Sequence, residues 1–268
     1  MQNTLQKIGC LGPQGSYSQL AAMKFCDNCE ILLFGSFPAV VSALISGEID
    51  FAVLPIENSI QGGVLQNLDL LDGQEIFAVK ECVLPIDHRL VTRGHVPYER
   101  IKCVYSHEQA IGQCSEFLER NLPDVRRIFT QSTAECLEKI GADSAGIVGG
   151  HVRGEGLVLS DENIANEKNN FTRFMLCVKR TDILPQHSDM VFFCAVCAHK
   201  PGALAELLRV FEKHGLNLTR IESRPIPQSF GEYRFFIEFA GDIGSVTVSK
   251  AILEAESLCM RFRILGAY

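Results

Sequence analysis

Apolar and polar positions along the first two thirds of the chain predict strands and helices in alternation. Apolar residues recur at helical spacing in Phe37, Val40, Val41 and Leu44, and Gly47 follows as a stop signal. Short apolar runs typical of buried strands lie at residues 7–11, 51–54, 101–105, 127–130 and 145–148. Strands that alternate with helices predict a mostly parallel α/β sheet, in which ligands bind outside the carboxyl ends of the strands.

The pattern changes after residues 179–189, a polar stretch that contains Pro185 and that we interpret as a linker. Amphipathic helices are predicted around Leu204–Phe211 and Val248–Ala255. Strands are predicted at residues 190–198, 216–223, 233–239 and 260–264. The resulting order, βαββαβ, predicts a ferredoxin-like unit of about 80 residues. Its unpaired sheet edges favour dimerisation.

Three polar segments follow predicted strands directly. They are Gly12-Pro13-Gln14-Gly15-Ser16, Pro55-Ile56-Glu57-Asn58-Ser59 and Ser106-His107-Glu108-Gln109. Because ligands bind at this edge of an α/β sheet, we expect a site assembled from several loops. The segment Gly12–Ser16 matches neither the G-x-G-x-x-G pattern nor the P-loop pattern of nucleotide-binding proteins. Local roles also fit: a tight turn at Gly12–Ser16, a helix cap at Ser106 and a turn closed by Asn58.

The segment Asn169-Asn170-Phe171-Thr172-Arg173-Phe174 places a hydroxyl and a guanidinium between two phenylalanines. The planar fork of an arginine suits a carboxylate, and apolar neighbours strengthen that contact. Periodicity alone also fits a plain strand, with Arg173 on one face and Thr172 and Phe174 on the other.

Composition excludes several classes of protein. The chain has 268 residues and is 47% hydrophobic and 21% charged, which is ordinary for a folded protein. Its net charge of −7 disfavours nucleic-acid binding. No apolar window of about 18 residues occurs, so no membrane span is expected. The N-terminus lacks the apolar core of a signal peptide, and we expect a cytoplasmic protein.

The eleven cysteines are mostly scattered singly through apolar runs, and we expect them to act as small buried hydrophobes. Two pairs have CxxC spacing, Cys26 with Cys29 and Cys194 with Cys197. A zinc site would need two knuckles with matching loops. In a strand, moreover, residues three apart point to opposite faces, which applies to the second pair. We therefore expect packing and no metal.

Four segments, in order and at sensible spacing, resemble the motifs of the prephenate dehydratase family: Gly12–Ser18, Pro55–Ser59, Ser106–Ala110 and Asn170–Phe174. The C-terminal unit is similar to the ACT regulatory domain, whose two phenylalanine-binding motifs match Lys200–Ala205 and Ile221–Pro225. The resemblance covers nearly the whole chain. It implies a catalytic domain at residues 1–182, two-lobed like periplasmic binding proteins, and an ACT domain at residues 189–268. The expected lobes are 1–78 with 160–182, and 79–159.

The resemblance implies conversion of prephenate to phenylpyruvate, with loss of CO2 and the ring hydroxyl, in L-phenylalanine biosynthesis. No cofactor is expected, because aromatisation drives the reaction. The expected catalytic residues are Thr172, Arg173 and Phe174. Arg173 would anchor the side-chain carboxylate, and Thr172 would stabilise charge on the departing oxygen. An apolar wall from Phe171 or Phe174 would leave the ring carboxylate unpaired, so that it departs as CO2. The expected lining residues are Asn58, Ser59, Ser106, Gln113 and Phe171.

Regulation by L-phenylalanine is also implied, with the effector bound between two ACT units of a homodimer or homotetramer and feedback inhibition as the result. The residues implied are Gly202, Ala203, Leu204, Asn217, Leu218, Glu222 and Ser223. The segment Glu81–Leu84 departs from the family's usual histidine-containing version. Two alternatives stay open: an arogenate dehydratase, and a non-catalytic amino-acid sensor, against which the Thr172–Arg173 pair argues.

Overall fold

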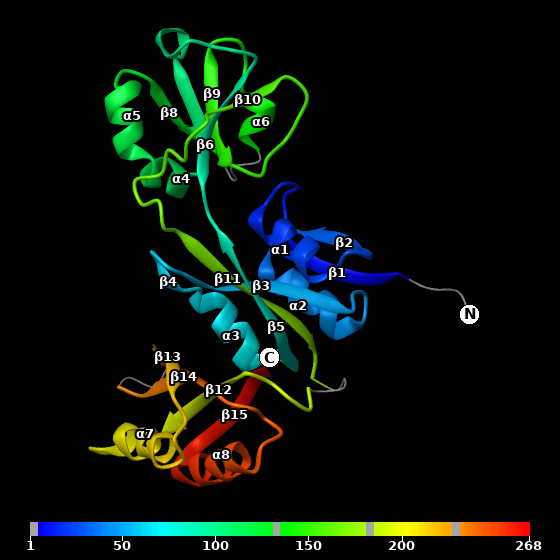
Figure 1. The fold of residues 1–268 in the computed structure, drawn as a ribbon, viewed down its shortest axis with the longest axis vertical. Helices are drawn as coiled ribbons and strands as arrows, with labels where there is room; N and C mark the ends of the chain where they lie inside the picture. Colours follow the sequence, from blue (N-terminus) through cyan, green and yellow to red (C-terminus); the bar gives the residue numbers. More distant parts are fainter. Residues whose placement is uncertain (1–4, 131–134, 181–184, 227–230) are drawn as a thin grey trace.

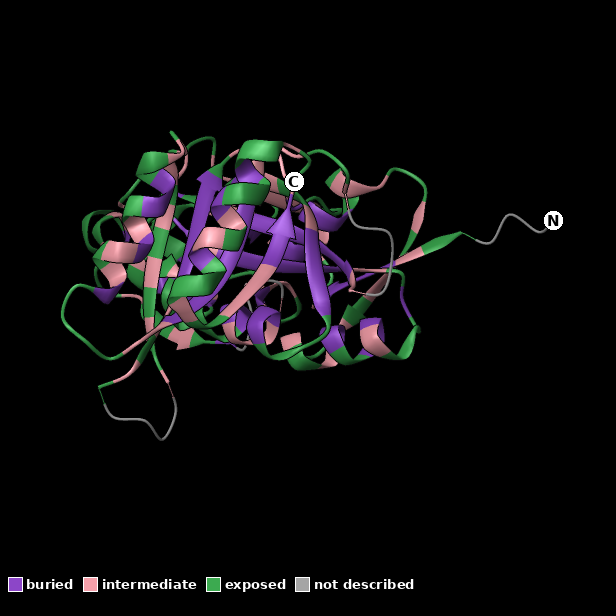
Figure 2. Ribbon diagram, turned by 90° about the horizontal axis from the view of Figure 1, so that it is seen from below, coloured by how far each residue is buried: buried purple, intermediate pink, exposed green. Residues whose placement is uncertain are grey.

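The computed structural model describes residues 5–130, 135–180, 185–226 and 231–268. It consists of two α/β lobes and a C-terminal unit, stacked along the long axis with lobe 1 in the middle (Figure 1). The predicted α/β class is confirmed. Buried strands run through the centre, and the helices turn their exposed faces outward (Figure 2). In the described part of the chain, no helix is both long and apolar enough to span a bilayer.

Lobe 1 is built on a mixed sheet with strand order β5-β11-β3-β1-β2. The strand β1 is parallel to β2 and β3, whereas β11 runs antiparallel to β3 and β5. Its elements are β1 (Gln6–Leu11), α1 (Tyr17–Phe25), β2 (Cys29–Phe34), α2 (Phe37–Ser46), β3 (Phe51–Asn58), β4 (Gly62–Gly63), α3 (Leu65–Gly73), β5 (Ile76–Pro85) and β11 (Phe171–Lys179).

Lobe 2 has its own sheet, with strand order β10-β6-β9-β7-β8. The strand β7 is parallel to β8 and β9, as the βα alternation predicts. The elements are β6 (His88–Arg93), η1 (Tyr98–Arg100), β7 (Cys103–Ser106), α4 (Glu108–Gln113), α5 (Ser115–Asn121), β8 (Arg126–Phe129), α6 (Cys136–Lys139), β9 (Ser144–Gly149) and β10 (Leu157–Leu159).

The C-terminal unit has the predicted βαββαβ order, with antiparallel strands arranged β13-β14-β12-β15. Its elements are β12 (Met190–Cys197), α7 (Ala203–Lys213), β13 (Leu218–Pro225), β14 (Tyr233–Ala240), α8 (Val246–Leu258) and β15 (Cys259–Ala267). The apolar face of α7, with Leu207 and Phe211, packs on one side of this sheet. The ferredoxin-like topology is confirmed.

The sheets of lobe 1 and the C-terminal unit are continuous, which the sequence did not indicate. The strand β15 pairs with β5 through Gly266 and Ala78. A Cβ atom at Gly266 would lie 2.8 Å from the Ala78 Cβ atom, so the close approach requires glycine. One hydrophobic cluster also spans both units and joins Leu54, Leu71 and Met175 to Phe192 and Phe236.

The chain crosses between the lobes twice, as expected, but the first crossing differs in position. The strand β5 remains paired with β11 up to Pro85, so the crossing lies at residues 86–87 rather than at 78/79. The return runs from the end of β10 to Phe171, where β11 begins.

Other local predictions differ from the structure. The spacing of Ile111, Cys114 and Leu118 predicts one helix face. The structure divides this helix into α4 and α5, because Cys114 has a non-helical backbone, although all three side chains share one core. The sequence Ser132-Thr133-Ala134-Glu135 predicts a capping box, but residues 132–134 lie outside the described residues, as do residues 181–184 of the predicted linker. Cys26 and Cys29, for which we expected plain packing, form a disulfide. Cys194 and Cys197 do pack on opposite faces of β12.

Candidate active site

A cavity of about 340 Å³ opens where the two lobes meet. It receives side chains from the end of β3, from the start of β11, from the first turn of α1, from α4, and from Ile86 and His88 at and directly after the first crossing. This is the edge at which α/β sheets bind ligands. The lining residues are Leu11, Gly12, Pro13, Ser16, Tyr17, Asn58, Ile86, His88, His107, Gln109, Ala110, Gln113, Asn170 and Thr172. Three expected site residues are therefore brought together: Asn58, Gln113 and Thr172.

Thr172 faces the cavity from the second position of β11. Its strand neighbour on β3 is Asn58, whose side-chain N–H donates to the Thr172 Oγ1 atom over 3.0 Å. A threonine hydroxyl can accept and donate at the same time. Since Asn58 occupies an acceptor position, the Thr172 hydrogen can point elsewhere, and the geometry makes Thr172 a donor toward a ligand. Donation to the oxygen also polarises the O–H bond and strengthens it as a donor.

Asn58 and Ser59 hold the segment that precedes Thr172. The Asn58 amide also donates to Asn170 Oδ1 over 2.7 Å and to the Phe171 carbonyl over 3.1 Å. The Ser59 hydroxyl accepts from the Phe171 N–H over 2.9 Å and donates to the Asn169 carbonyl over 3.3 Å. The Asn58 Oδ1 atom accepts from the backbone N–H groups of Ile60 and Gln61 in the following turn. The expected turn at Asn58 is confirmed, and the same side chain reaches the cavity.

His88 is a lining residue that the sequence analysis missed. Its Nε2 atom lies 2.8 Å from Gln113 Oε1, and because an amide oxygen only accepts, Nε2 carries the hydrogen. The Nδ1 atom is then an acceptor, and it is buried without a partner among the described residues. Burial lowers the pKa of His88, against a weaker upward effect of Gln113, so the ring is neutral near pH 7. A signal existed: Asp87 and His88 are polar residues that follow closely on the end of β5 at Pro85.

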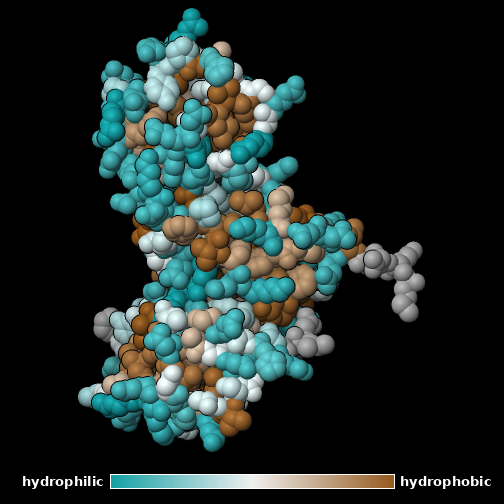
Figure 3. Space-filling view, viewed as in Figure 1, coloured by the Kyte–Doolittle hydropathy of each residue, from teal (hydrophilic) through white to brown (hydrophobic). Residues whose placement is uncertain are grey.

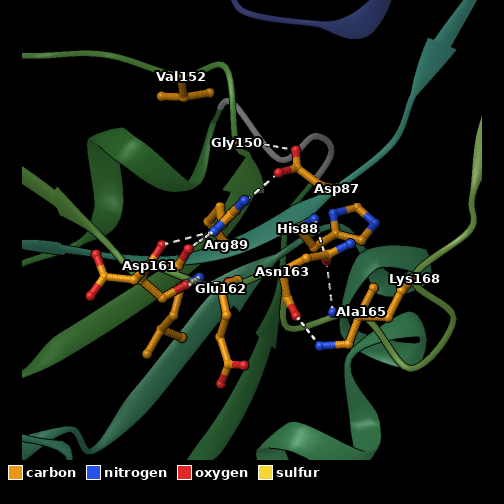
Figure 4. A network of polar contacts seen from close by, with 12 residues as sticks. Asp87, His88, Arg89, Gly150, Val152, Asp161, Glu162, Asn163, Ala165 and Lys168 are labelled. Atoms are coloured by element: carbon orange, nitrogen blue, oxygen red, sulfur yellow. Dashed lines mark hydrogen bonds and ion pairs between the residues drawn. The ribbon is translucent and has the colours of Figure 1, made fainter.

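A polar network fixes the crossing that carries His88 (Figure 4). Asp87 accepts from the Arg89 Nε–H and from the Gly150 N–H, each over 2.9 Å. The His88 N–H donates to Asn163 Oδ1 over 3.0 Å, and the Asn163 carbonyl accepts from Lys168. Asn163 and Lys168 belong to the return crossing, so the network ties the two crossings together.

Direct contacts also join the lobes around the cavity. The Tyr17 hydroxyl donates to the Asp87 carbonyl over 2.6 Å, and burial raises the pKa of Tyr17, which keeps it protonated. The Gln109 amide donates to Gln61 Oε1 over 3.0 Å. The His151 Nε2 atom lies 2.9 Å from the Gly15 carbonyl oxygen. The two lobes are therefore in direct contact around the cavity.

Arg173 is not where we expected it. Strand alternation turns it away from Thr172, toward the C-terminal unit, where its two terminal nitrogens bind Glu238 over 2.8 and 2.6 Å. Its side chain is 17% exposed and that of Glu238 is fully buried. Burial works to lower the pKa of Arg173, but the hydrogen bonds and charge of Glu238 prevail and raise it. Arg173 is not among the residues that line the cavity.

Four more expected site residues lie outside the cavity lining. Phe174 is 2% exposed and packs beneath α1. Phe171 is 42% exposed at the start of β11. Ser106 is buried and donates to the Ile147 carbonyl over 2.7 Å, whereas the N-cap of α4 is His107. Ser59 binds the backbone of the neighbouring segment, as described above. Each serine hydroxyl is thus engaged in positioning backbone.

The expected effector residues fall into two groups. Ala203 and Leu204, at the start of α7, line a cavity of about 160 Å³, and Gly202 precedes them with a left-handed backbone, φ 84°. Leu218, Glu222 and Ser223 lie on β13, the edge strand of the sheet, and Asn217 just precedes it. Glu222 and Ser223 point to opposite faces. A Cβ atom at Gly63 of lobe 1 would lie 3.3 Å from Glu222 Oε2, whereas Ser223 is exposed.

The chain was compared with protein families, curated proteins and solved structures. The family model for prephenate dehydratase matches residues 8–182, and that for the ACT domain matches residues 193–256. Prephenate dehydratase from Amycolatopsis methanolica is 33% identical over 271 residues, covering 98% of this chain and 88% of that protein.

Two solved structures share the fold over 98% of this chain. Prephenate dehydratase from Arthrobacter aurescens, solved in complex with L-Phe, has a TM-score of 0.86 at 31% identity, with 90% of its chain covered. The enzyme from Staphylococcus aureus has a TM-score of 0.86 at 29% identity and is covered completely. Together with the motifs gathered at the cavity, these matches show that the chain belongs to the prephenate dehydratase family and carries a C-terminal ACT domain.

Proposed function

We propose that this chain is a lyase that converts prephenate to phenylpyruvate, CO2 and water. The bond between the ring and its carboxylate breaks, and the electron pair enters the ring. The ring becomes aromatic as the bond to the hydroxyl breaks, and the departing oxygen takes up a proton to leave as water. Besides family membership, one observation carries the proposal: a threonine hydroxyl, held by Asn58, faces the interlobe cavity.

Thr172 acts on the departing hydroxyl. As a donor prepared by Asn58, it stabilises the charge that develops on that oxygen. A fixed donor does not have to reorganise during the reaction, which is the main advantage of a preorganised site over water. Asn170 belongs to the same arrangement, because its Oδ1 atom also accepts from the Asn58 amide.

The cavity also suits the carboxylate that must leave. A strong cation there would stabilise the substrate more than the transition state. The lining contains neither lysine nor arginine, and Leu11, Pro13, Ile86 and Ala110 supply apolar surface. We assign the apolar wall to these residues, in place of Phe171 and Phe174. The side-chain carboxylate can be received by the amides of Gln109 and Gln113 and by the first turn of α1, whose N–H groups favour an anion.

The test is production of phenylpyruvate from prephenate, run side by side with arogenate as substrate. Thr172→Ala should lower kcat by about a hundredfold or more, the scale for loss of one preorganised donor. Thr92→Ala is the matched control, since Thr92 is also a strand threonine, and its hydroxyl donates a hydrogen bond to the Gly94 carbonyl. Near-normal turnover in Thr172→Ala would remove the threonine from the mechanism. Binding of phenylalanine without conversion of either substrate would favour a sensor.

We further propose that L-phenylalanine binds at the ACT domain and inhibits turnover. The ACT match and the family relative whose structure contains L-Phe support this. Gly202, Ala203 and Leu204 would supply one side of the site. Residues of β13 would supply the other side from a second copy, since β13 is a sheet edge in one chain. This second side of the phenylalanine site would consist of Asn217, Leu218 and Ser223. Glu222 would contribute from the other face of β13, which is turned toward lobe 1.

Titration of turnover with phenylalanine tests this proposal. Ala203→Leu should weaken inhibition by about tenfold or more, because the added atoms fill a cavity of about 160 Å³. Ala205→Leu is the control, since Ala205 lies exposed on the same helix. Inhibition that is equal in both variants would place the effector elsewhere.

We also propose that residues 1–182 and 189–268 are the catalytic and ACT domains, and that the protein is a cytoplasmic homodimer or homotetramer. The exposed edge of β13 and the family matches support this assignment. Sedimentation with and without phenylalanine gives the oligomeric state, and a monomer under both conditions would contradict it.

A further inference from the structure

A cluster of charged residues lies directly behind Thr172. Arg173 contacts Glu238 of β14, Glu81 of β5 at 3.2 Å, and Glu57 of β3 at 3.6 Å. Arg220 of β13 approaches Glu57 at 3.9 Å and is itself mostly buried. We call these five residues the interdomain charge cluster. It joins three strands of lobe 1 to two strands of the ACT domain.

Within this cluster the pair Arg173–Glu238 has the strongest geometry. Both terminal nitrogens of Arg173 bind both carboxylate oxygens of Glu238, which is a bidentate pair with a fixed relative orientation. Glu238 is fully buried, and the ion pair with Arg173 offsets the loss of water around its carboxylate. The pair therefore fixes the backbone of Arg173 relative to β14, and Thr172 is the adjacent residue on β11.

We propose that Arg173 is a positioning residue, whose ion pair with Glu238 makes the placement of the Thr172 hydroxyl depend on the ACT sheet. This inference rests on the proposed function. Opposite faces of one strand serve the two domains: Thr172 faces the cavity, and Arg173 faces β14. Adjacent residues share a peptide unit, so a shift of the pair moves Thr172 as well. Glu238 is also the register partner of Arg220, which links it to the edge strand β13.

A second polar contact between the same domains provides a control. Asp72, buried at the end of α3, binds Arg234 over 2.9 Å and Arg261 over 2.7 Å. It resembles Glu238 in burial and in having arginine partners across the interface, but α3 carries none of the residues that line the cavity. Asp72→Asn therefore weakens domain docking without acting on the strand of Thr172.

The experiment measures kcat and KM for prephenate in the full chain, for wild type, Arg173→Gln, Glu238→Gln, the double variant and Asp72→Asn. We expect each single variant to lower kcat by about tenfold, with KM within about twofold, since small displacements of a reacting group carry losses of this size. The double variant should be no worse than either single variant, because both act through one pair. Asp72→Asn should retain kcat within about twofold.

Four outcomes would overturn the proposal. A raised KM in Arg173→Gln, absent from Glu238→Gln, would mean that Arg173 holds the substrate. Unchanged kcat in Glu238→Gln, additive losses in the double variant, or an equal loss in Asp72→Asn would exclude positioning through this pair. If a single variant fails to fold, the kcat and KM of the double variant decide, because the double variant leaves neither charge of the pair unmatched. A wild type without phenylpyruvate production would instead refute the proposed function.

Discussion

The Asn58 amide N–H lies 3.0 Å from the Thr172 hydroxyl oxygen, across neighbouring strands of one sheet. The same amide contacts Asn170 and the Phe171 carbonyl. One side chain from β3 thus determines both the path of the chain into β11 and the direction of the hydroxyl that we place on the substrate.

Asn58→Asp tests the donor role directly. A carboxylate has nearly the shape of the amide and still accepts from Ile60 and Gln61, but it cannot donate to Thr172. We expect kcat to fall by at least about tenfold while the fold is retained. Asn166→Asp is the control, because Asn166 makes comparable amide contacts with Ser115 and Glu116 outside the cavity lining. Equal kcat values for the two variants would contradict the assignment.

Asn170 shapes the entry to β11. Its Oδ1 atom accepts from Asn58, and its carbonyl accepts from the Ile86 N–H over 2.8 Å. Asn170→Ala removes the side-chain contact, which should cost about 1 kcal/mol of stability and lower kcat several-fold through Thr172. Urea unfolding and steady-state kinetics measure both effects. A variant with wild-type stability and turnover would show that the Asn170 side chain is dispensable.

The buried ring of His88 should make stability depend on pH. Burial lowers its pKa below the ordinary value of 6.5, so the unfolded chain binds more protons than the folded chain just below that pH. The stability that the folded chain gains from the neutral, buried His88 ring is fully present above pH 6.5 and is lost as the pH falls below that value. His88→Gln should show a smaller loss of stability between about pH 7 and pH 5 than wild type does. His95→Gln, at an exposed histidine, should follow wild type; identical slopes for all three would refute this account.

Gly266 tests the junction between the two domains. In Gly266→Ala the new Cβ atom would meet the Ala78 Cβ atom at 2.8 Å and the Ala78 carbonyl oxygen at 3.0 Å. Overpacking of this kind costs about 1–3 kcal/mol, and we expect a lower thermal midpoint. Gly73→Ala is the control, because a Cβ atom there meets nothing within 4 Å. A midpoint for Gly266→Ala as high as that of Gly73→Ala would mean that the β15–β5 junction relaxes without cost.

Much of the fold could be predicted from the chain itself. The periodicity of residues 190–264 predicts the ferredoxin-like unit, since each element there has a clear apolar face. The strands β2, β5, β6 and β10 were missed. For β2 and β10 the reason is that partly buried strands carry a weak pattern. The disulfide of Cys26 and Cys29 was missed for a different reason. Spacing alone does not give the distance between two sulfur atoms.

Hydrophilic side chains cover much of the visible face of lobe 2 (Figure 3). On lobe 1, in the middle of the molecule, apolar patches alternate with hydrophilic ones. Such a surface gives no sign of the site, which is built from loops of both lobes. The sequence analysis named Asn58, Thr172 and Gln113 as site residues, and these three do meet at one cavity. His88 was missed because it lies at a crossing between the lobes, and the sequence analysis placed that crossing too early.

The sequence by itself determined that the segment around Thr172 and Arg173 fits a strand, in which successive side chains alternate, but it left open whether both residues serve one site. It could not determine what lies on either side. Only the tertiary structure decided that Thr172 meets Asn58 at the interlobe cavity and that Arg173 meets a buried Glu238. The physical reason is that both partners come from distant parts of the chain. Long-range packing of two lobes and a third domain brings them together, and no local pattern records it.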